Sequence, residues 1–389
     1  MLQKYINIMK YSIFETDFFV ITFFFFIFVT KLLISMFSLS IILPIYNVEK
    51  YIQRCLESIL IQDNADICIE CIIVDDCTPD GSMSIVRQIL SDYRGSIRFN
   101  LLVHDKNRGL SAARNTGIIH AEGDYVLFMD SDDYLLPNSI LYFVRYLNLY
   151  PDVDLIMGNV KNKKNDSLLI SPIKDPLLIS DCNVFLQRAL RHKIYLYAWN
   201  KMIKRKVLID NHIFFEEGII YEDQCWSYQL FSTISSVLML PMVTYIYEYN
   251  VNSIVNTTFS LENAEKAVRS YTISVNKVLD NPPHNKKYRR NLTVDYLLFM
   301  TYFLLNGVDI QAQFSISKDV ARDFLNVRKK LLYRCARNGR LLLFCFFLLL
   351  FPPLSRIQEL KMFRRHYDQI EFVVNRLSHL TDFLHNKNR

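Results

Sequence analysis

Short apolar runs alternate along the chain with segments whose apolar residues recur at helical spacing. Runs of this kind, bounded by turn-forming residues, are typical of buried strands. They predict strands at residues 38–43, 69–74, 97–103, 125–129 and 154–157. Between them, Ile52, Leu56 and Ile59 mark one helix, and others are expected around Ile85 and Leu141. Strands that alternate with helices predict an α/β domain with a doubly wound, mostly parallel sheet.

Two of the predicted strands end in acidic residues. Asp75 and Asp76 follow the second strand, and Asp130, Asp132 and Asp133 follow the fourth. Because the carboxyl ends of parallel strands lie at one edge of a sheet, both tips are expected to share one ligand cleft. Carboxylates this close repel one another unless a cation lies among them, and acidic clusters suit Mg²⁺ or Mn²⁺. The alternative for the second cluster is a solvated turn, where Asp is also favoured.

Five motifs, in a fixed order, extend this pattern. They are Ser40-Ile-Ile-Leu-Pro-Ile-Tyr-Asn47, Ile72-Ile-Val-Asp-Asp76, Asp80-Gly-Ser82, Asn107-Arg-Gly-Leu-Ser-Ala-Ala-Arg-Asn115 and Met129-Asp-Ser-Asp-Asp133. Over about residues 38–255 the chain resembles the inverting glycosyltransferases of family 2, as found in bacterial polysaccharide synthesis. The resemblance implies the GT-A fold, a Rossmann-like arrangement. Neither a P-loop motif nor the glycine pattern of a standard dinucleotide fold occurs.

The resemblance implies roles for individual residues. Asp130-Ser-Asp132 resembles the DXD element of the family, which binds Mn²⁺ or Mg²⁺ with the sugar-nucleotide diphosphate, and Asp133 is a third acid able to join it. Nucleotide-sugar binding is implied for Pro44, Tyr46, Asp76, Arg114 and Asp130. An aromatic ring stacks on any base, and a cation on a diphosphate neutralises its charge. Taken alone, Tyr46 would be an ordinary turn residue and Arg114 a surface helix residue.

A second acidic pair, Glu222-Asp223, precedes a predicted helix that continues through Trp226. The family places its general base at such a pair, and transfer to a hydroxyl needs one carboxylate to accept the proton. The resemblance therefore implies Asp223 as the base, with Glu222 as the alternative. The competing interpretation is an acidic residue favoured at a helix N-terminus by the macrodipole.

Composition excludes some partners. The net charge of +6 over 389 residues is too small and too dispersed to predict a nucleic-acid partner. Among the 8 cysteines, Cys68 and Cys71 form the sole C-x-x-C motif, and no second pair completes a zinc site. Structural thiols in a reducing cytosol are predicted instead.

Residues 1–37 form an apolar N-terminal segment. Its apolar run at 18–30 is interrupted by Lys31 and resumes at 32–37, and the whole stretch reaches the length of a membrane span only if Lys31 is tolerated. The run leads into the first strand with almost no linker. Residues 1–35 are therefore either a signal anchor or a mis-called extension before a true start at Met36, and we favour the extension.

The C-terminal third combines cations with a short apolar segment. Residues 341–351 are apolar apart from one thiol and too few to span a bilayer. The preceding cations are Arg328, Lys329, Lys330, Arg334, Arg337 and Arg340. This pairing favours a helix in one leaflet, attracted to anionic lipids. The alternative is a buried core helix with a solvated basic face. Residues 261–389 are thus predicted to be helical and membrane-associating.

The family resemblance implies a glycosyltransferase of the metal-dependent, inverting, hexosyltransferase type. Residues 38–260 form the GT-A domain, in which 38–159 bind the nucleotide sugar and 160–260 the acceptor. The expected donor is a UDP-sugar. The expected acceptor is a hydroxyl of a lipid-linked or growing glycan, at the cytoplasmic face of the cell membrane, in cell-surface polysaccharide synthesis. The alternative from another class is a catalytically silent glycan-binding or scaffold protein, against which the intact acids argue. A nucleotidyltransferase is disfavoured because residues 44–47 lack a glycine-rich loop.

Overall fold

The computed structural model describes residues 37–63, 67–170, 172–181, 195–250 and 261–280, with isolated residues between 184 and 330. The N-terminal apolar run before Phe37 and the apolar segment 341–351 lie outside these residues, so their membrane roles stay predictions. Within the described part of the chain, no helix is long and apolar enough to cross a membrane.

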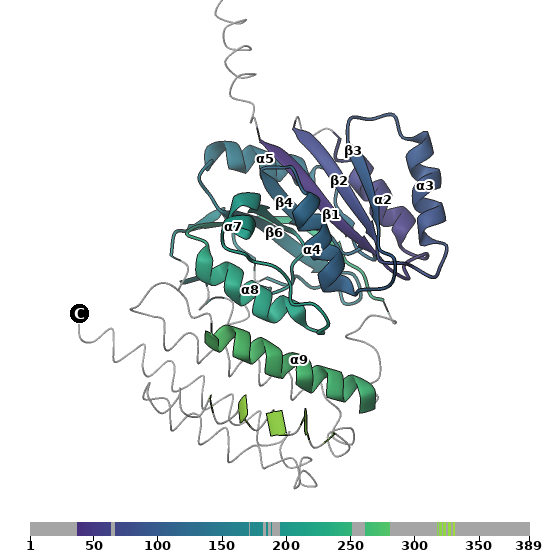
Figure 1. Cartoon of the computed structure of the whole chain (residues 1–389). Helices are drawn as coiled ribbons and strands as arrows, with labels where there is room; N and C mark the ends of the chain where they lie inside the picture. Colours follow the sequence, from purple (N-terminus) through teal and green to yellow (C-terminus); the bar gives the residue numbers. More distant parts are fainter. Residues whose placement is uncertain are drawn as a thin grey trace, which may run out of the picture. The chain divides into compact units, whose positions relative to one another are not determined.

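The described residues form helices and strands that alternate through the first half of the chain (Figure 1). In chain order they are β1 (Ser38–Ile45), α2 (Ile52–Leu60), β2 (Cys68–Asp75), α3 (Ser82–Asp92), β3 (Arg98–Val103), α4 (Leu110–His120), β4 (Tyr125–Phe128), β5 (Tyr134–Leu135), α5 (Ser139–Leu149), β6 (Leu155–Asn162), β7 (Leu177–Ile179), β8 (Lys201–Lys204), α7 (Arg205–Asp210), α8 (Glu222–Thr233), β9 (Val237–Tyr247) and α9 (Leu261–Asp280).

These strands join one mixed sheet in the order β3-β2-β1-β4-β8-β6-β9-β5, with β7 paired to β9. Strands β3, β2, β1 and β4 are parallel, as predicted. Beyond β4 the sheet departs from that pattern: β8 is antiparallel to both neighbours, and β5 and β7 are antiparallel to β9. Strands β6 and β9, by contrast, are parallel. Apolar runs mark strands but not their direction, so the antiparallel pairs were not predicted.

Strand β1 is central and extends past its predicted end. It continues through Pro44 to Ile45, with Pro44 in register with Val74 of β2. Met129 N donates to Ile42 O, so the backbone polar groups of Ile42 point toward β4. The backbone nitrogen of Pro44, two residues further along, points in the same direction. Pairing with β4 stops at Ile42, so no partner there loses a hydrogen bond to the missing N–H of proline.

Helix α4 packs against β1 and β2, in front of which it lies in Figure 1. The close approach depends on Gly117, where a Cβ would lie 2.3 Å from Ile42 Cγ2. This packing places the start of α4, which follows Gly109, at the edge where the parallel strands end. Asp76 binds the backbone there: Gly109 N donates to its Oδ2 at 2.7 Å.

The chain divides into two compact units. The first comprises Met1–Gly218 and Leu230–Asn250, and the second Ile219–Gln229 and Val251–Arg389. The described part of the second unit includes α9, whose buried residues recur at helical spacing: Ala267, Val268, Tyr271, Val275 and Val278. Within this unit, Ile220 N donates to Ser270 Oγ on α9 at 3.0 Å.

Candidate active site

The ends of three parallel strands lie side by side. Asp76 N, just after β2, donates to Ile45 O of β1 at 3.0 Å, and Met129 N, just after β4, donates to Ile42 O of β1 at 3.0 Å. The residues that follow β1, β2 and β4 therefore meet at one edge of the sheet, where open α/β sheets bind ligands. This is the arrangement expected for the two acidic strand tips.

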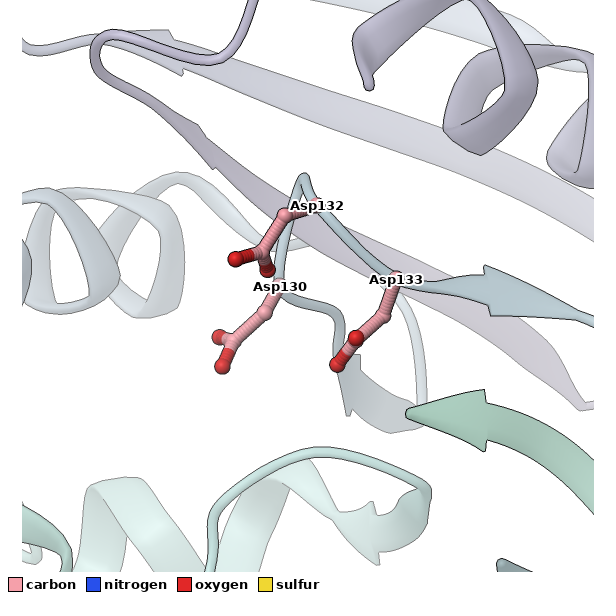
Figure 2. Close-up of side chains that lie close together, drawn as sticks. All are labelled: Asp130, Asp132 and Asp133. Carbon is pink, nitrogen blue, oxygen red and sulfur yellow. The ribbon is translucent and has the colours of Figure 1, made fainter. Parts of the chain in front are cut away.

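The acidic turn between β4 and β5 carries the three aspartates. Asp130, Asp132 and Asp133 each offer a carboxylate oxygen, and these oxygens lie within 4.8 Å of one another. Figure 2 shows the side chains leaving one short turn, with Asp133 at the end that leads into β5. Carboxylate oxygens so grouped form a donor set that fits a hard divalent cation.

Burial and mutual repulsion disfavour the charged forms of two of these acids. Burial first, and then Asp130, raise the pKa of Asp132 to about 6. Burial also raises the pKa of Asp133 well above its usual range, and Asp132 and Asp130 add to the effect. A cation among the carboxylates would oppose the repulsion, and the raised pKa values are what close carboxylates without one are expected to have.

Strand β9 and the residues after it hold the acidic turn in place. Tyr245 Oη donates to Asp133 Oδ2 at 2.7 Å, and Glu248 N donates to Asp133 Oδ1 at 2.8 Å. Asn250 Nδ2 donates to Asp132 Oδ2 at 2.9 Å. Sequence reasoning missed these residues because they lie more than a hundred positions along the chain from the turn. The one available signal was the alternation of Tyr245 and Tyr247, which puts both rings on one face of a strand.

Arg114 is the basic partner of the acidic turn. It is 1% exposed, and its Nη2 donates to Asp130 Oδ1 at 2.7 Å. Its Cζ lies 5.1 Å from the ring centroid of Phe215. The alternative interpretation of Arg114 as a surface helix residue is therefore wrong: α4 points it into the site.

The residues predicted to hold the nucleotide base take different positions. Pro44 is buried within β1, whereas Tyr46, two residues on, is 45% exposed at the strand end. Asp76 is 2% exposed, and its Oδ1 accepts from Arg108 N at 2.9 Å and lies 2.6 Å from His104 Nδ1. Asp76 therefore shapes the loop before α4, and a contact of Asp76 with a base stays a prediction.

Glu222 and Asp223 occupy the first turn of α8, as the sequence pattern predicts. Glu222 is 5% exposed, and Asp223 is partly exposed. Both belong to the second compact unit, whereas the acidic turn belongs to the first. The role of either residue as general base stays a prediction.

Comparison with known proteins adds an independent finding. The model of the family described as glycosyl transferase family 2 matches residues 40–211. The Bacillus subtilis protein EpsJ, described as an uncharacterized glycosyltransferase, is 31% identical over 243 residues, which are 61% of this chain and 68% of EpsJ. Staphylococcus aureus TarS, a poly(ribitol-phosphate) beta-N-acetylglucosaminyltransferase, is 28% identical over 214 residues, which are 54% of this chain and 35% of TarS.

Among solved structures, S. aureus TarS 1–349 in complex with UDP-GlcNAc is similar, with a TM-score of 0.59 at 20% identity. The match covers 76% of this chain and 81% of that one. Similarity at this level of identity shows a shared fold. The predicted α/β class of the chain is thereby confirmed.

Proposed function

The chain belongs to the family 2 glycosyltransferases, and from this premise we propose that it transfers a sugar, with inversion, from a UDP-sugar to a hydroxyl of a glycan. One observation carries the proposal beyond family membership. The acidic turn places the carboxylates of Asp130 and Asp132 beside each other at the end of β4, next to the buried guanidinium of Arg114.

The donor side of the reaction is assigned to the first unit. Asp130 and Asp132 would hold Mn²⁺ or Mg²⁺, which when bound would supply positive charge to the diphosphate that leaves with the nucleoside. Arg114 orients the Asp130 carboxylate through their contact at 2.7 Å. The exposed ring of Tyr46 stacks on the base beside Pro44, and Asp76 fixes the loop around it.

The transfer step needs a proton acceptor. The acceptor hydroxyl oxygen forms a bond to the anomeric carbon of the sugar as the bond from that carbon to the diphosphate oxygen breaks. The hydroxyl proton passes to the carboxylate of Asp223 or, as the alternative, Glu222. Attack opposite the leaving group inverts the anomeric configuration.

Donor and acceptor classes follow from different observations. A UDP-sugar is supported by TarS, a relative whose fold is shared and whose crystal structure contains UDP-GlcNAc. A lipid-linked or growing glycan acceptor, met at the cytoplasmic face of the cell membrane, is supported by the basic and apolar stretch at 328–351. This assigns the protein to cell-surface polysaccharide synthesis.

The decisive experiment screens a panel of nucleotide sugars for Mn²⁺-dependent release of nucleoside diphosphate. We expect a UDP-sugar to be turned over by the wild-type chain. Asp132→Ala and Asp223→Ala are each expected to abolish transfer, but only Asp132→Ala removes the metal-dependent binding of UDP, measured by calorimetry.

Asp92→Ala serves as the control. Asp92 is an exposed acid at the end of α3, from which the chain enters the start of β3, whereas the acidic turn follows the end of a strand. It should retain wild-type turnover. Full transfer activity in both Asp132→Ala and Asp223→Ala would overturn the assignment. The absence of turnover with every donor, in the presence of UDP binding, would favour a catalytically silent protein.

A further inference from the structure

We propose that Tyr245 is a positioning residue for the cation site, acting through Asp133 so that Asp130 and Asp132 face the cation. The inference rests on the proposed function, because it assigns a task to a residue beside the same acidic turn. It also narrows the role of Asp133, which becomes the anchor of the turn rather than a ligand.

The Tyr245 hydroxyl bridges the two ends of the acidic turn. It donates to Asp133 Oδ2 at 2.7 Å and accepts from Asp130 N at 3.2 Å. One oxygen thus fixes both the first residue of the turn, through its backbone, and the last, through its side chain. Within the turn, Asp133 N also donates to Asp130 O at 3.1 Å.

Asp133 faces β9. Its second oxygen accepts from Glu248 N at 2.8 Å, and the residue is 1% exposed. Both oxygens of Asp133 are therefore engaged by β9 and the residues after it, whereas Asp130 and Asp132 keep part of their surface exposed. This division suits Asp130 and Asp132 as ligands and Asp133 as the group that locks their turn in place.

Packing fixes the Tyr245 ring itself. The ring stacks on Trp199 with centroids 4.8 Å apart and an interplanar angle of 1°. Trp199 also stacks on Tyr197 and Tyr195, at 4.9 and 5.1 Å. Strand β5, which leaves the acidic turn, pairs with β9 at this point, with Leu135 opposite Tyr245. A hydroxyl on so constrained a ring can hold the turn in one geometry before a cation binds.

Groups that hold metal ligands in place typically change metal affinity by about 10- to 100-fold when they are removed. Tyr245→Phe removes the hydroxyl and keeps the stacked ring. We therefore expect the full chain carrying Tyr245→Phe to bind Mn²⁺ about 10-fold or more weakly, measured from the electron paramagnetic resonance signal of free Mn²⁺ without donor. With the UDP-sugar, the Mn²⁺ concentration for half-maximal turnover should rise by a similar factor.

Tyr195→Phe is the matched control. Tyr195 is also buried, in the same aromatic stack, but its hydroxyl donates to Asn200 O and Gly158 O, away from the acidic turn. It should lose thermal stability to a similar extent while Mn²⁺ affinity stays at the wild-type value. Equal Mn²⁺ affinities in the two variants would overturn the inference.

A second comparison covers the case in which Tyr245→Phe does not fold. Asp133→Asn retains an oxygen for the Tyr245 hydroxyl, whereas Asp132→Asn removes a proposed ligand charge. If Asp133 anchors the turn and is not a ligand, Asp133→Asn should lower Mn²⁺ affinity less than Asp132→Asn does. An equal or larger loss for Asp133→Asn would overturn the inference. Failure of the proposed function is distinguishable, since the wild-type chain would then bind Mn²⁺ without turning over any donor.

Discussion

At the scale of single residues, the three aspartates of one turn differ because of what surrounds them. Asp130 meets the guanidinium of Arg114, Asp132 meets the amide of Asn250, and Asp133 is enclosed by donors from β9 and the residues after it. Residue type alone therefore does not assign the ligand role. These surroundings support the proposal that Asp133 anchors the turn and that the other two aspartates bind the cation.

Arg114 gives the prediction at this scale. Its guanidinium is 1% exposed beside Asp130, and breaking a buried pair by removing one partner commonly costs about 3–5 kcal/mol. We expect Arg114→Met to lower the free energy of unfolding toward the lower end of that range, because Asp130 is itself partly exposed. Denaturant unfolding of the cation-free protein would measure the loss.

Two further variants separate the contribution of the Arg114–Asp130 ion pair from that of the packing of the Arg114 side chain. Arg94→Met removes an exposed arginine and should change stability by less than about 0.5 kcal/mol. Adding Asp130→Asn to Arg114→Met should recover part of the loss, because the unpaired carboxylate is gone. No recovery in the double variant would mean that the lost packing of Arg114, not its charge, accounts for the effect.

At the scale of elements, Glu70 joins three parallel strands near the ends that lie opposite the acidic turn. Its Oε1 accepts from Ser40 Oγ of β1 at 2.5 Å and from Glu122 N at 2.7 Å, and its Oε2 accepts from Arg98 Nη2 of β3 at 2.7 Å. The residue itself lies on β2 and is 6% exposed. One carboxylate thus fixes the register of the parallel strands whose opposite ends form the site.

The second prediction concerns acid stability. Burial tends to raise the pKa of Glu70, but the hydrogen bonds from Ser40, Glu122 and Arg98 outweigh it and lower the pKa below its ordinary value of 4.5. A lowered pKa means that this carboxylate stabilises the fold above about pH 4.5 and that the contribution is lost as pH falls through the folded-state pKa. Glu70→Gln should cost about 2 kcal/mol at pH 7.

The difference between wild type and Glu70→Gln should shrink as pH falls from 5 toward 3. Urea unfolding at several pH values would follow it. Glu122→Gln is the matched control, because Glu122 binds the same Arg98 from a side chain that is 71% exposed. It should cost less than about 1 kcal/mol at any of these pH values. A pH-independent cost for Glu70→Gln would contradict the ionic role.

At the scale of the whole molecule, the residues with proposed roles are distributed over both compact units. Asp130 and Asp132 belong to the first, and Glu222 and Asp223 to the second, which also contains the basic and apolar C-terminal stretch. The proposed base and the stretch predicted to meet the membrane therefore belong to the same unit.

Membrane association is the prediction at this scale. The full chain should float with vesicles containing phosphatidylglycerol, and changing Arg334, Arg337 and Arg340 to Gln should weaken binding by about 1 kcal/mol for each charge. Vesicles of phosphatidylcholine alone should bind both proteins weakly. The control changes three exposed cations of the first unit, Lys50, Arg94 and Lys106, to Gln. Equal flotation of both triple variants would argue against a specific basic surface.

The sequence by itself determined the class of the fold and where the acidic residues lie along it. Apolar runs mark buried segments of the chain, so β1, β2, β3 and β4 were located within a few residues, and β6 was located at its start. The turn after β4 was likewise predictable, because carboxylates that follow a buried strand stand at its tip. The motif order then identified the family.

Only the tertiary structure decided which groups share a contact across the chain. Tyr245 reaches Asp133 through the pairing of β5 with β9, and the antiparallel direction of that pairing leaves no trace in apolar periodicity. The burial of Arg114 depends on Gly117, which lets α4 approach β1. Such contacts join residues far apart in sequence, and their free energy appears only when the chain is folded. Composition and spacing therefore predicted the acidic turn but not the residues that hold it in place.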